Sequence, residues 1–422
     1  MMQLFSIWKQ EFFFFTISSY LITQGWATAA NAANLQHLER LRTTNSCPKC
    51  DLTDAQLTAA DLQKADLSNA KLNGADLSGA DLRGVNLSGA QLRGAKLLGA
   101  DLTGANLRQA KLGVRQQEKK QIVTDLQNAN LQGANLTAAE LTSAKLTRAN
   151  LRAAKLNYAQ LANANLEQSN LTGSTLGAAN LVGANLKAAQ LKIANLSGAN
   201  LTGAQISGAN LETISADSVN FSNANLYQAN LNEANLDHAL LKGAKLQEAI
   251  LIAANLRGAD LSGSDSRKAN LKGADFNRAN LSAANLEGAD LTNAKLAVAN
   301  LTSAQLTDAK LPFTYLHGAN LTQANLSKVD LRRALLRSAD LTSATLVGAI
   351  LENATLISAQ LTKANFSDAN LTQCDLRGAN LTDANLSNAN LSQADLELAT
   401  LANTNLNGAN LKDANFKDAI RR

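Results

Sequence analysis

Large apolar residues recur at every fifth position along most of the chain. The stretch ANLSGANLTGAQISGANL at residues 194–211 places Leu196, Leu201, Ile206 and Leu211 five residues apart. An α-helix turns about 100° per residue, so a spacing of five scatters these side chains around its axis. A strand alternates its faces, so an odd spacing puts successive side chains on opposite sides. The pattern instead predicts a chain that turns a corner every five residues, with the central aliphatic residue of each short side pointing inward.

The period of five covers two long runs. The first run has 13 repeats centred on residues from Leu52 to Leu112, and the second has 59 repeats centred on residues from Leu126 to Phe416. A small residue, nearly always alanine, stands two positions before each centre, and Asn or Asp is favoured directly before it. Leu112 and Leu126 are 14 residues apart, nine more than one repeat, so residues 113–125 (GVRQQEKKQIVTD) are predicted to form a charged surface loop leaving a corner.

The A(D/N)LXX pattern resembles that of the pentapeptide repeat family over residues 50–420. The resemblance implies an all-β fold, a right-handed quadrilateral β-helix with four repeats per coil. The 13 + 59 = 72 repeats would then make about 18 coils, with backbone hydrogen bonds running from coil to coil. Members of the family often pair or are capped at the C-terminal end, so the resemblance also implies a homodimer through the C-terminal coil.

Two irregular repeats test this geometry. With four repeats per coil, centres ten residues apart face each other across the core, as Ser266 and Phe276 would. We expect the larger ring to fill the space that the serine leaves, because protein interiors are close-packed. At Ile214 and Ala216 the large and small inward residues are exchanged within one repeat, which conserves volume in the same way.

The N-terminal residues differ from the repeats. Lys9 precedes an uncharged run at residues 12–30 (FFFFTISSYLITQGWATAA), which predicts a signal peptide over 1–30 and export to a periplasm or a thylakoid lumen. An uncleaved membrane anchor is the alternative, because the run is almost long enough to span a bilayer. Residues 31–50 contain Leu35, Leu38 and Leu41, whose spacing predicts a short helical cap over the first coil. Repeats then fill residues 51–112 and 126–420.

A Cys-x-x-Cys motif, Cys47-Pro48-Lys49-Cys50, lies beside the first coil. A zinc site would need two further ligands, and the third cysteine, Cys374, is far along the chain. A disulfide fastening the cap, a redox-active pair and two free thiols remain possible from the sequence. Export favours the disulfide, because disulfides persist in oxidising compartments.

Charge and composition argue against nucleic-acid binding and against an enzymatic function. The net charge of +5 is small for 422 residues and is scattered, so no nucleic-acid partner is expected. The three histidines are His37, His238 and His317, and none is paired with a nucleophile in the repeat geometry. The sequence predicts no catalytic residue, cofactor site or metal site.

The best-understood activity in the family, DNA mimicry that shields a type II topoisomerase, remains an alternative function, although it calls for a cytoplasmic protein with an acidic face.

Two outward-facing patterns are candidate binding surfaces. A threonine follows the centre in five successive coils of one side, which predicts a flat ladder for ice, ordered water or a glycan: Thr302, Thr322, Thr342, Thr362 and Thr382. Outward apolar residues cluster on two neighbouring sides and predict a contact with a protein partner: Val298, Phe313, Tyr315, Leu335, Ile350 and Ile357. The preferred function is an exported, non-enzymatic scaffold with an unidentified protein partner, contacting a membrane only through an uncleaved leader.

Overall fold

The structure, a computed structural model, describes residues 34–421, so the signal peptide predicted over residues 1–30 lies outside the described residues. Backbone contacts divide these residues into an N-terminal unit that ends at Asn200 and a C-terminal unit that begins at Leu201. Helix α2 (Leu35–Thr44) and the strands β1 (Val114–Gln117) and β2 (Lys120–Val123) belong to the N-terminal unit. No helix within residues 34–421 is long and apolar enough to span a membrane.

Each repeat forms a tight turn followed by a single bridging residue. At Leu321 the backbone N–H of Ala324 donates to the carbonyl of Leu321 at 3.0 Å, and the third residue of this turn, Gln323, has a φ of 59°. A hydrogen bond across four residues with a positive φ only at the third is the signature of a type II turn. The corner that the spacing of five predicts is therefore this turn, repeated along both units.

Backbone pairing between coils shows how many repeats make one coil. Parallel bridges join residues 20 positions apart, as between Asp61 and Asp81 in the N-terminal unit and between Asn320 and Asp340 in the C-terminal unit. Twenty residues are four repeats of five. The prediction of an all-β chain with little helix is confirmed, and each unit has the four-repeat register that the family resemblance implies. Bridges that span residues 113–125 join residues 29 apart, as in Lys111–Glu140, so the insertion leaves the register unchanged.

The residue before each centre explains the preference for Asn and Asp. In the C-terminal unit, Oδ1 of Asn300 accepts a hydrogen bond from the backbone N–H of Thr302 at 3.1 Å, which satisfies a donor that the turn leaves free. The side-chain amide of Asn300 also donates to Oδ1 of Asn280 at 3.1 Å, one coil earlier. An asparagine thus supports its own turn and joins two coils.

The core consists of the leucines at the centres and the alanines two positions before them, nearly all fully buried. Phe276 and Ser266 are both buried, so the prediction that Phe276 points inward is confirmed. Ile214 and Ala216 are buried together, as the exchange of large and small residues predicts. The interior therefore accommodates irregular repeats by redistributing side-chain volume rather than by turning a residue outward.

The coil begins one repeat earlier than the sequence analysis placed it. Ser46 forms a bridge with Asp66, and the N–H of Cys47 donates to the carbonyl of Asp66 at 2.7 Å. Cys47 takes the place of the central leucine and Cys50 takes the place of the alanine. The cap over 31–50 is therefore helix α2 followed by one cysteine-containing repeat.

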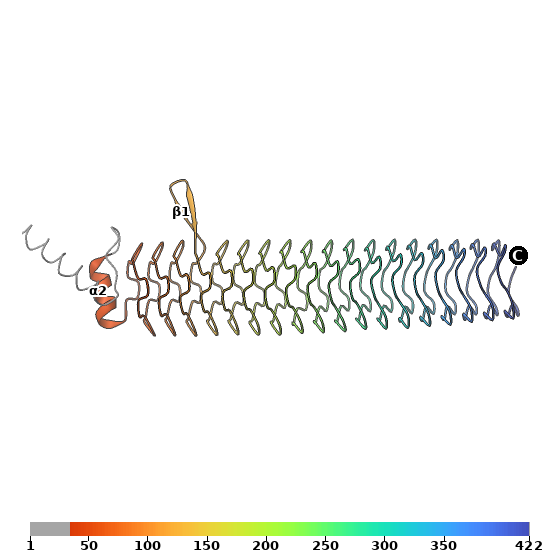
Figure 1. The fold of residues 1–422 in the computed structure, drawn as a ribbon, viewed down its shortest axis with the longest axis horizontal. Helices are drawn as coiled ribbons and strands as arrows, with labels where there is room; N and C mark the ends of the chain where they lie inside the picture. Colours follow the sequence, from red (N-terminus) through yellow and green to blue (C-terminus); the bar gives the residue numbers. More distant parts are fainter. Residues whose placement is uncertain (1–33, 422) are drawn as a thin grey trace, which may run out of the picture. The chain divides into compact units, whose positions relative to one another are not determined.

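Helix α2 lies at the N-terminal end of the coils of its unit (Figure 1). Oδ1 of Asn34 accepts a hydrogen bond from the N–H of Gln36 and starts the helix, and Leu38 and Leu41 are its buried residues. The backbone N–H of Asp51 donates to Nδ1 of His37 at 3.0 Å. The predicted amphipathic helix is thus present and is tied to the first coil.

The prediction of a loop at residues 113–125 is wrong in one respect, because most of this segment is an antiparallel hairpin. Strands β1 and β2 pair from Val114 opposite Val123 to Gln117 opposite Lys120. Figure 1 shows this hairpin projecting from the coils of the N-terminal unit. The β-branched residues at the base of the hairpin favour a strand. The prediction of a loop gave more weight to the charged residues at its tip.

Candidate functional site

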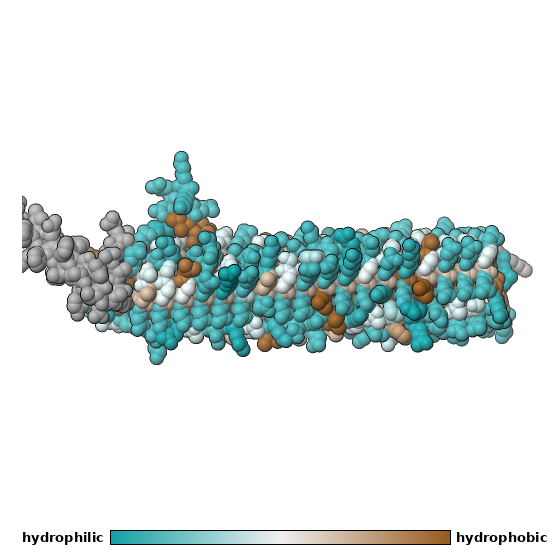
Figure 2. All heavy atoms as spheres, in the orientation of Figure 1, coloured by the Kyte–Doolittle hydropathy of each residue, from teal (hydrophilic) through white to brown (hydrophobic). Residues whose placement is uncertain are grey.

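The face of the molecule seen in Figure 2 is mainly hydrophilic, with a few small hydrophobic areas. The apolar patch predicted from the sequence lies in the C-terminal unit. Its most exposed members are Val298, Tyr315 and Phe313, with 63%, 46% and 45% of their surface accessible, while Leu335 and Ile357 are half-buried. Side chains of this size are exposed together on neighbouring coils, which is the arrangement expected of a contact surface.

Pairing between coils brings part of this patch together. Tyr315 and Leu335 are bridge partners, so they occupy the same column in successive coils. Phe313 is the third residue of the turn that ends directly before Tyr315. Ile350 forms a bridge with Asp330 and so lies in a different column from Tyr315 and Leu335. The patch therefore extends over two neighbouring sides, with Phe313 in the turn that joins them.

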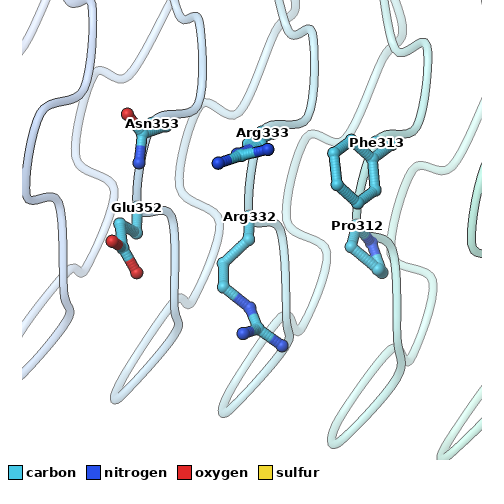
Figure 3. A pocket seen from close by; sticks show the side chains of 6 residues that line it. All are labelled: Pro312, Phe313, Arg332, Arg333, Glu352 and Asn353. Carbon is cyan, nitrogen blue, oxygen red and sulfur yellow. The ribbon is translucent and has the colours of Figure 1, made fainter.

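A shallow pocket of about 300 Å³ lies on the side that carries Phe313 (Figure 3). Six residues from three successive coils line it: Pro312, Phe313, Arg332, Arg333, Glu352 and Asn353. Five of these were missed in the sequence analysis. Pro312 carried a signal, since the chain has only two prolines, and a proline next to an outward phenylalanine is unusual in this repeat.

The two arginines of the pocket have different surroundings. Arg332 binds Asp330 through two hydrogen bonds of 2.9 and 2.7 Å, and this contact lowers the pKa of the Asp330 carboxyl below its usual value. The guanidinium of Arg333 lies over the ring of Phe313, 5.7 Å from its centroid, in a cation–π contact. The pocket thus combines Pro312 and Phe313 at one end with a cation over the Phe313 ring and the carboxylate of Glu352. Aromatic and arginine side chains are enriched where proteins contact one another.

The threonine ladder is present as five equivalent turn positions in consecutive coils. The hydroxyls of Thr302, Thr322 and Thr382 donate to Oδ1 of the asparagine two residues earlier, at 2.7, 2.6 and 2.7 Å. These hydroxyl hydrogens are therefore engaged within the repeat and are not directed at an outside ligand. The contacts favour a role in supporting the turns.

The structure places a disulfide between Cys47 and Cys50. Both cysteines are buried, at 0% and 2% accessible surface. A thiol or disulfide exchanges only when an attacking sulfur can reach it, so this arrangement favours a structural role over a redox-active one. Cys374 is buried at an alanine position, donates to the carbonyl of Leu351, and has its thiol pKa raised by burial.

Side chains that could bind a metal ion do not cluster in the part of the chain that the structure describes. Within residues 34–421 no three His, Cys, Asp or Glu side chains are grouped so that they could hold a metal ion. His238 is exposed and contacts its sequence neighbour Asp237 at 2.9 Å. His37 is engaged with the backbone of Asp51. These histidines have local structural partners.

The hairpin of the N-terminal unit is held firmly at its base. Arg115 forms an ion pair with Asp54, which raises the pKa of the guanidinium, and also donates to the carbonyl of Asn73 at 3.2 Å. The buried hydroxyl of Thr124 donates to the carbonyl of Leu92 at 2.8 Å and accepts from the N–H of Gly94 at 3.1 Å. The insertion is thus a fixed projection and a second candidate surface for a partner.

Gly94 provides the space that the hairpin base occupies. A Cβ at Gly94 would lie 2.9 Å from Cβ of Arg115 and 3.2 Å from Cγ2 of Ile122. We expect Gly94→Ala to displace the hairpin and to accelerate trypsin cleavage at Lys119 and Lys120 by at least about tenfold, corresponding to roughly 1.4 kcal/mol of lost local stability. Gly99→Ala is the matched control, since it has a similar φ of 64° and no atom within 4 Å. Equal cleavage of the two variants would contradict this account of the hairpin.

Comparison with known families gives one consistent result. A family model described as pentapeptide repeats matches residues 50–113, 124–157, 159–296 and 299–337. A second model, described as a pentapeptide repeat region, matches residues 349–419. The matched stretches cover well over half of the chain. No curated protein matches the sequence.

Several solved structures are similar to the chain. HetL, a pentapeptide repeat protein involved in heterocyst differentiation regulation from the cyanobacterium Nostoc, is 32% identical, with 63% of this chain and 92% of HetL covered and a TM-score of 0.16. A pentapeptide repeat protein from the thylakoid lumen of Arabidopsis thaliana is 34% identical, with coverages of 25% and 68% and a TM-score of 0.12. QnrB1, a plasmid-mediated fluoroquinolone resistance protein, is 24% identical, with coverages of 39% and 86% and a TM-score of 0.26. The family assignment rests on the repeat matches, because these TM-scores are low.

Proposed function

This chain belongs to the pentapeptide repeat family, and from that premise we propose that it is an exported, non-enzymatic scaffold that binds a protein partner through the apolar patch of its C-terminal unit. The observation that carries the proposal is the exposure of Phe313 and Tyr315 beside a pocket that contains a stacked arginine. Aromatic and arginine side chains are enriched where proteins bind one another. Outward Asn and Asp side chains elsewhere accept hydrogen bonds from their own turns, as Asn300 and Asn320 do.

Two features support export. The leader-like sequence at residues 1–30 has the charge and length of a signal peptide. The cysteine pair in the first repeat forms a disulfide, a bond that persists in a periplasm or in another oxidising compartment. A similar protein from a thylakoid lumen is consistent with the same kind of location.

The proposed architecture is the one implied by the family, a right-handed quadrilateral β-helix of about 18 coils.

We further propose that two copies of the chain form a homodimer through the C-terminal coil. Leu411 and Ile420 in this coil have 36% and 54% of their surface accessible, and the guanidinium of Arg421 lies over the Phe416 ring, 4.6 Å from its centroid. Apolar residues that are exposed together on one coil can form a contact with a second copy of the chain. Analytical ultracentrifugation measures the oligomeric state. We expect the unaltered protein to sediment as a dimer and the Leu411→Asp variant to sediment as a monomer.

Affinity purification of the full-length protein from its native host tests the patch. We expect the double variant Phe313→Asp/Arg333→Glu to retain at most about 3% of the captured partner, because losing a central contact typically costs at least about 2 kcal/mol of binding. Ile193→Asp is the control, since Ile193 is equally apolar and 60% accessible but lies in the N-terminal unit. Recovery of the same partner by all three proteins would exclude the patch as the contact surface, and deletion of residues 114–123 would then test the hairpin.

A further inference from the structure

Ser264 has an unusual buried hydroxyl. It occupies the alanine position of the repeat centred on Ser266, and only 1% of its surface is accessible. Its Oγ has no hydrogen-bond partner among the residues that the structure describes. A buried hydroxyl without a partner destabilises a protein, so nearly all such groups in native structures are bonded to protein or to ordered water.

Three other buried hydroxyls at the same position of the repeat behave differently. Ser169, Ser174 and Thr314 each donate to the carbonyl three residues earlier, at 2.7 Å in every case. The repeats that contain them have a leucine at the centre. The repeat of Ser264 has Ser266 there instead, and serine is two heavy atoms smaller than leucine.

The leucines on either side of Ser266 also differ from the other centres. Leu261 and Leu271 each retain 2% accessible surface, whereas the other leucine centres from Leu52 to Leu396 retain 0% or 1%. The two leucines that flank Ser266 therefore keep slightly more accessible surface than the other centres, as expected beside a side chain smaller than leucine.

We propose that the core of the C-terminal unit contains an ordered water molecule bound between the hydroxyls of Ser264 and Ser266. The third partner is the carbonyl of Leu261, the group equivalent to the acceptor that Ser169, Ser174 and Thr314 use directly. Three hydrogen bonds are typical of a buried water. This site satisfies the Ser264 hydroxyl and explains why two serines occur together where the repeat calls for alanine and leucine.

A crystal structure of the protein tests the proposal directly. We expect an isolated density peak within about 3.2 Å of Oγ of both Ser264 and Ser266, with no continuous path to bulk solvent. A structure in which Ser264 bonds directly to the carbonyl of Leu261, or in which the ring of Phe276 occupies the space without a peak, would overturn it.

Thermal unfolding provides a second, independent measurement. Ser266→Ala removes one ligand of the water, so we expect the Tm to fall by about 1–3 °C. Ser264→Ala should lower the Tm to a similar extent as Ser174→Ala, which removes a hydrogen bond already formed in the same repeat position. If the cavity is dry, Ser264→Ala instead raises the Tm, because it removes an unpartnered hydroxyl, and Ser266→Ala leaves the Tm unchanged. Either of these results would refute the bound water.

Discussion

Leu341→Lys is expected to unfold the coils around residue 341. Leu341 is completely buried, and replacing it forfeits about 1.5–3 kcal/mol of apolar burial. The lysine must also place an ammonium group, or a neutral amine, in an apolar interior, which adds several kcal/mol of desolvation penalty. The sum is comparable to the whole stability of an ordinary domain. Circular dichroism on heating and limited proteolysis should show an early transition that the unaltered protein does not have.

Thr342→Lys is the matched control for this experiment. Thr342 is the next residue along the chain and points outward, and its backbone N–H bonds to Oδ1 of Asp340 at 2.9 Å, a contact that a lysine retains. We expect its effect on stability to be within about 0.5 kcal/mol. If the two variants melt at the same temperature, Leu341 cannot be a core residue of a coil.

The period of five made most of the fold predictable, because it fixes which residue of every repeat points inward. A single leucine and a single alanine fill each side of the core, so the pattern survives in almost every repeat. The residue type at the third position of each turn was a weaker guide to the backbone conformation there. Glycine occupies many of these positions, but Gln323 and Lys328 adopt the same positive φ, at 59° and 56°. The coil hydrogen bonds on both sides of the turn outweigh the cost of about 1 kcal/mol for such a conformation.

The first repeat was missed because cysteines replace both of its inward residues. Cys47 stands five positions before Leu52, so the spacing carried the signal, but the residue type suggested separate chemistry. The backbone shows an ordinary repeat, with the N–H of Cys50 donating to the carbonyl of Cys47 at 3.3 Å. The motif is therefore a packing element of the coil.

The candidate site was only partly predictable, because the residue types at its outward positions give little indication of function. Outward positions accept almost any polar residue, so Arg332 and Arg333 look like ordinary members of the repeat. The apolar members were visible as exceptions to that rule. The stacking of Arg333 on Phe313 follows from the coil length, since the two residues are 20 positions apart. Searching for complementary side chains at that separation would have located the pocket.

Removing the Cys47–Cys50 disulfide should destabilise the first coil and helix α2. Closing so short a loop restricts the unfolded chain by about 2 kcal/mol in the entropic description of disulfides, and this stabilisation is lost in Cys47→Ala/Cys50→Ala. Both cysteines also fill the core positions of their repeat. The sulfur of Cys47 lies 3.2 Å from the carbonyl oxygen of His37 in helix α2, so alanine at residue 47 removes this contact with the helix. We expect faster amide hydrogen exchange at Leu38 and Leu52 and no change in the C-terminal unit.

Cys374→Ala is the control for this double variant, because it replaces a buried cysteine outside the first coil. We expect it to leave amide exchange at Leu38 and Leu52 unchanged.

Alkylation tests the state of all three cysteines. The Cys374 thiol is buried and its pKa is raised, so iodoacetamide should leave Cys374 unmodified in the folded protein, with or without a reductant. Addition of a reductant should allow labelling at residues 47 and 50 only as fast as the first coil opens, because both sulfurs are buried beneath the cap. Labelling of these two residues in the untreated, folded protein would show that they are free thiols, and the first coil would then owe its stability to packing alone.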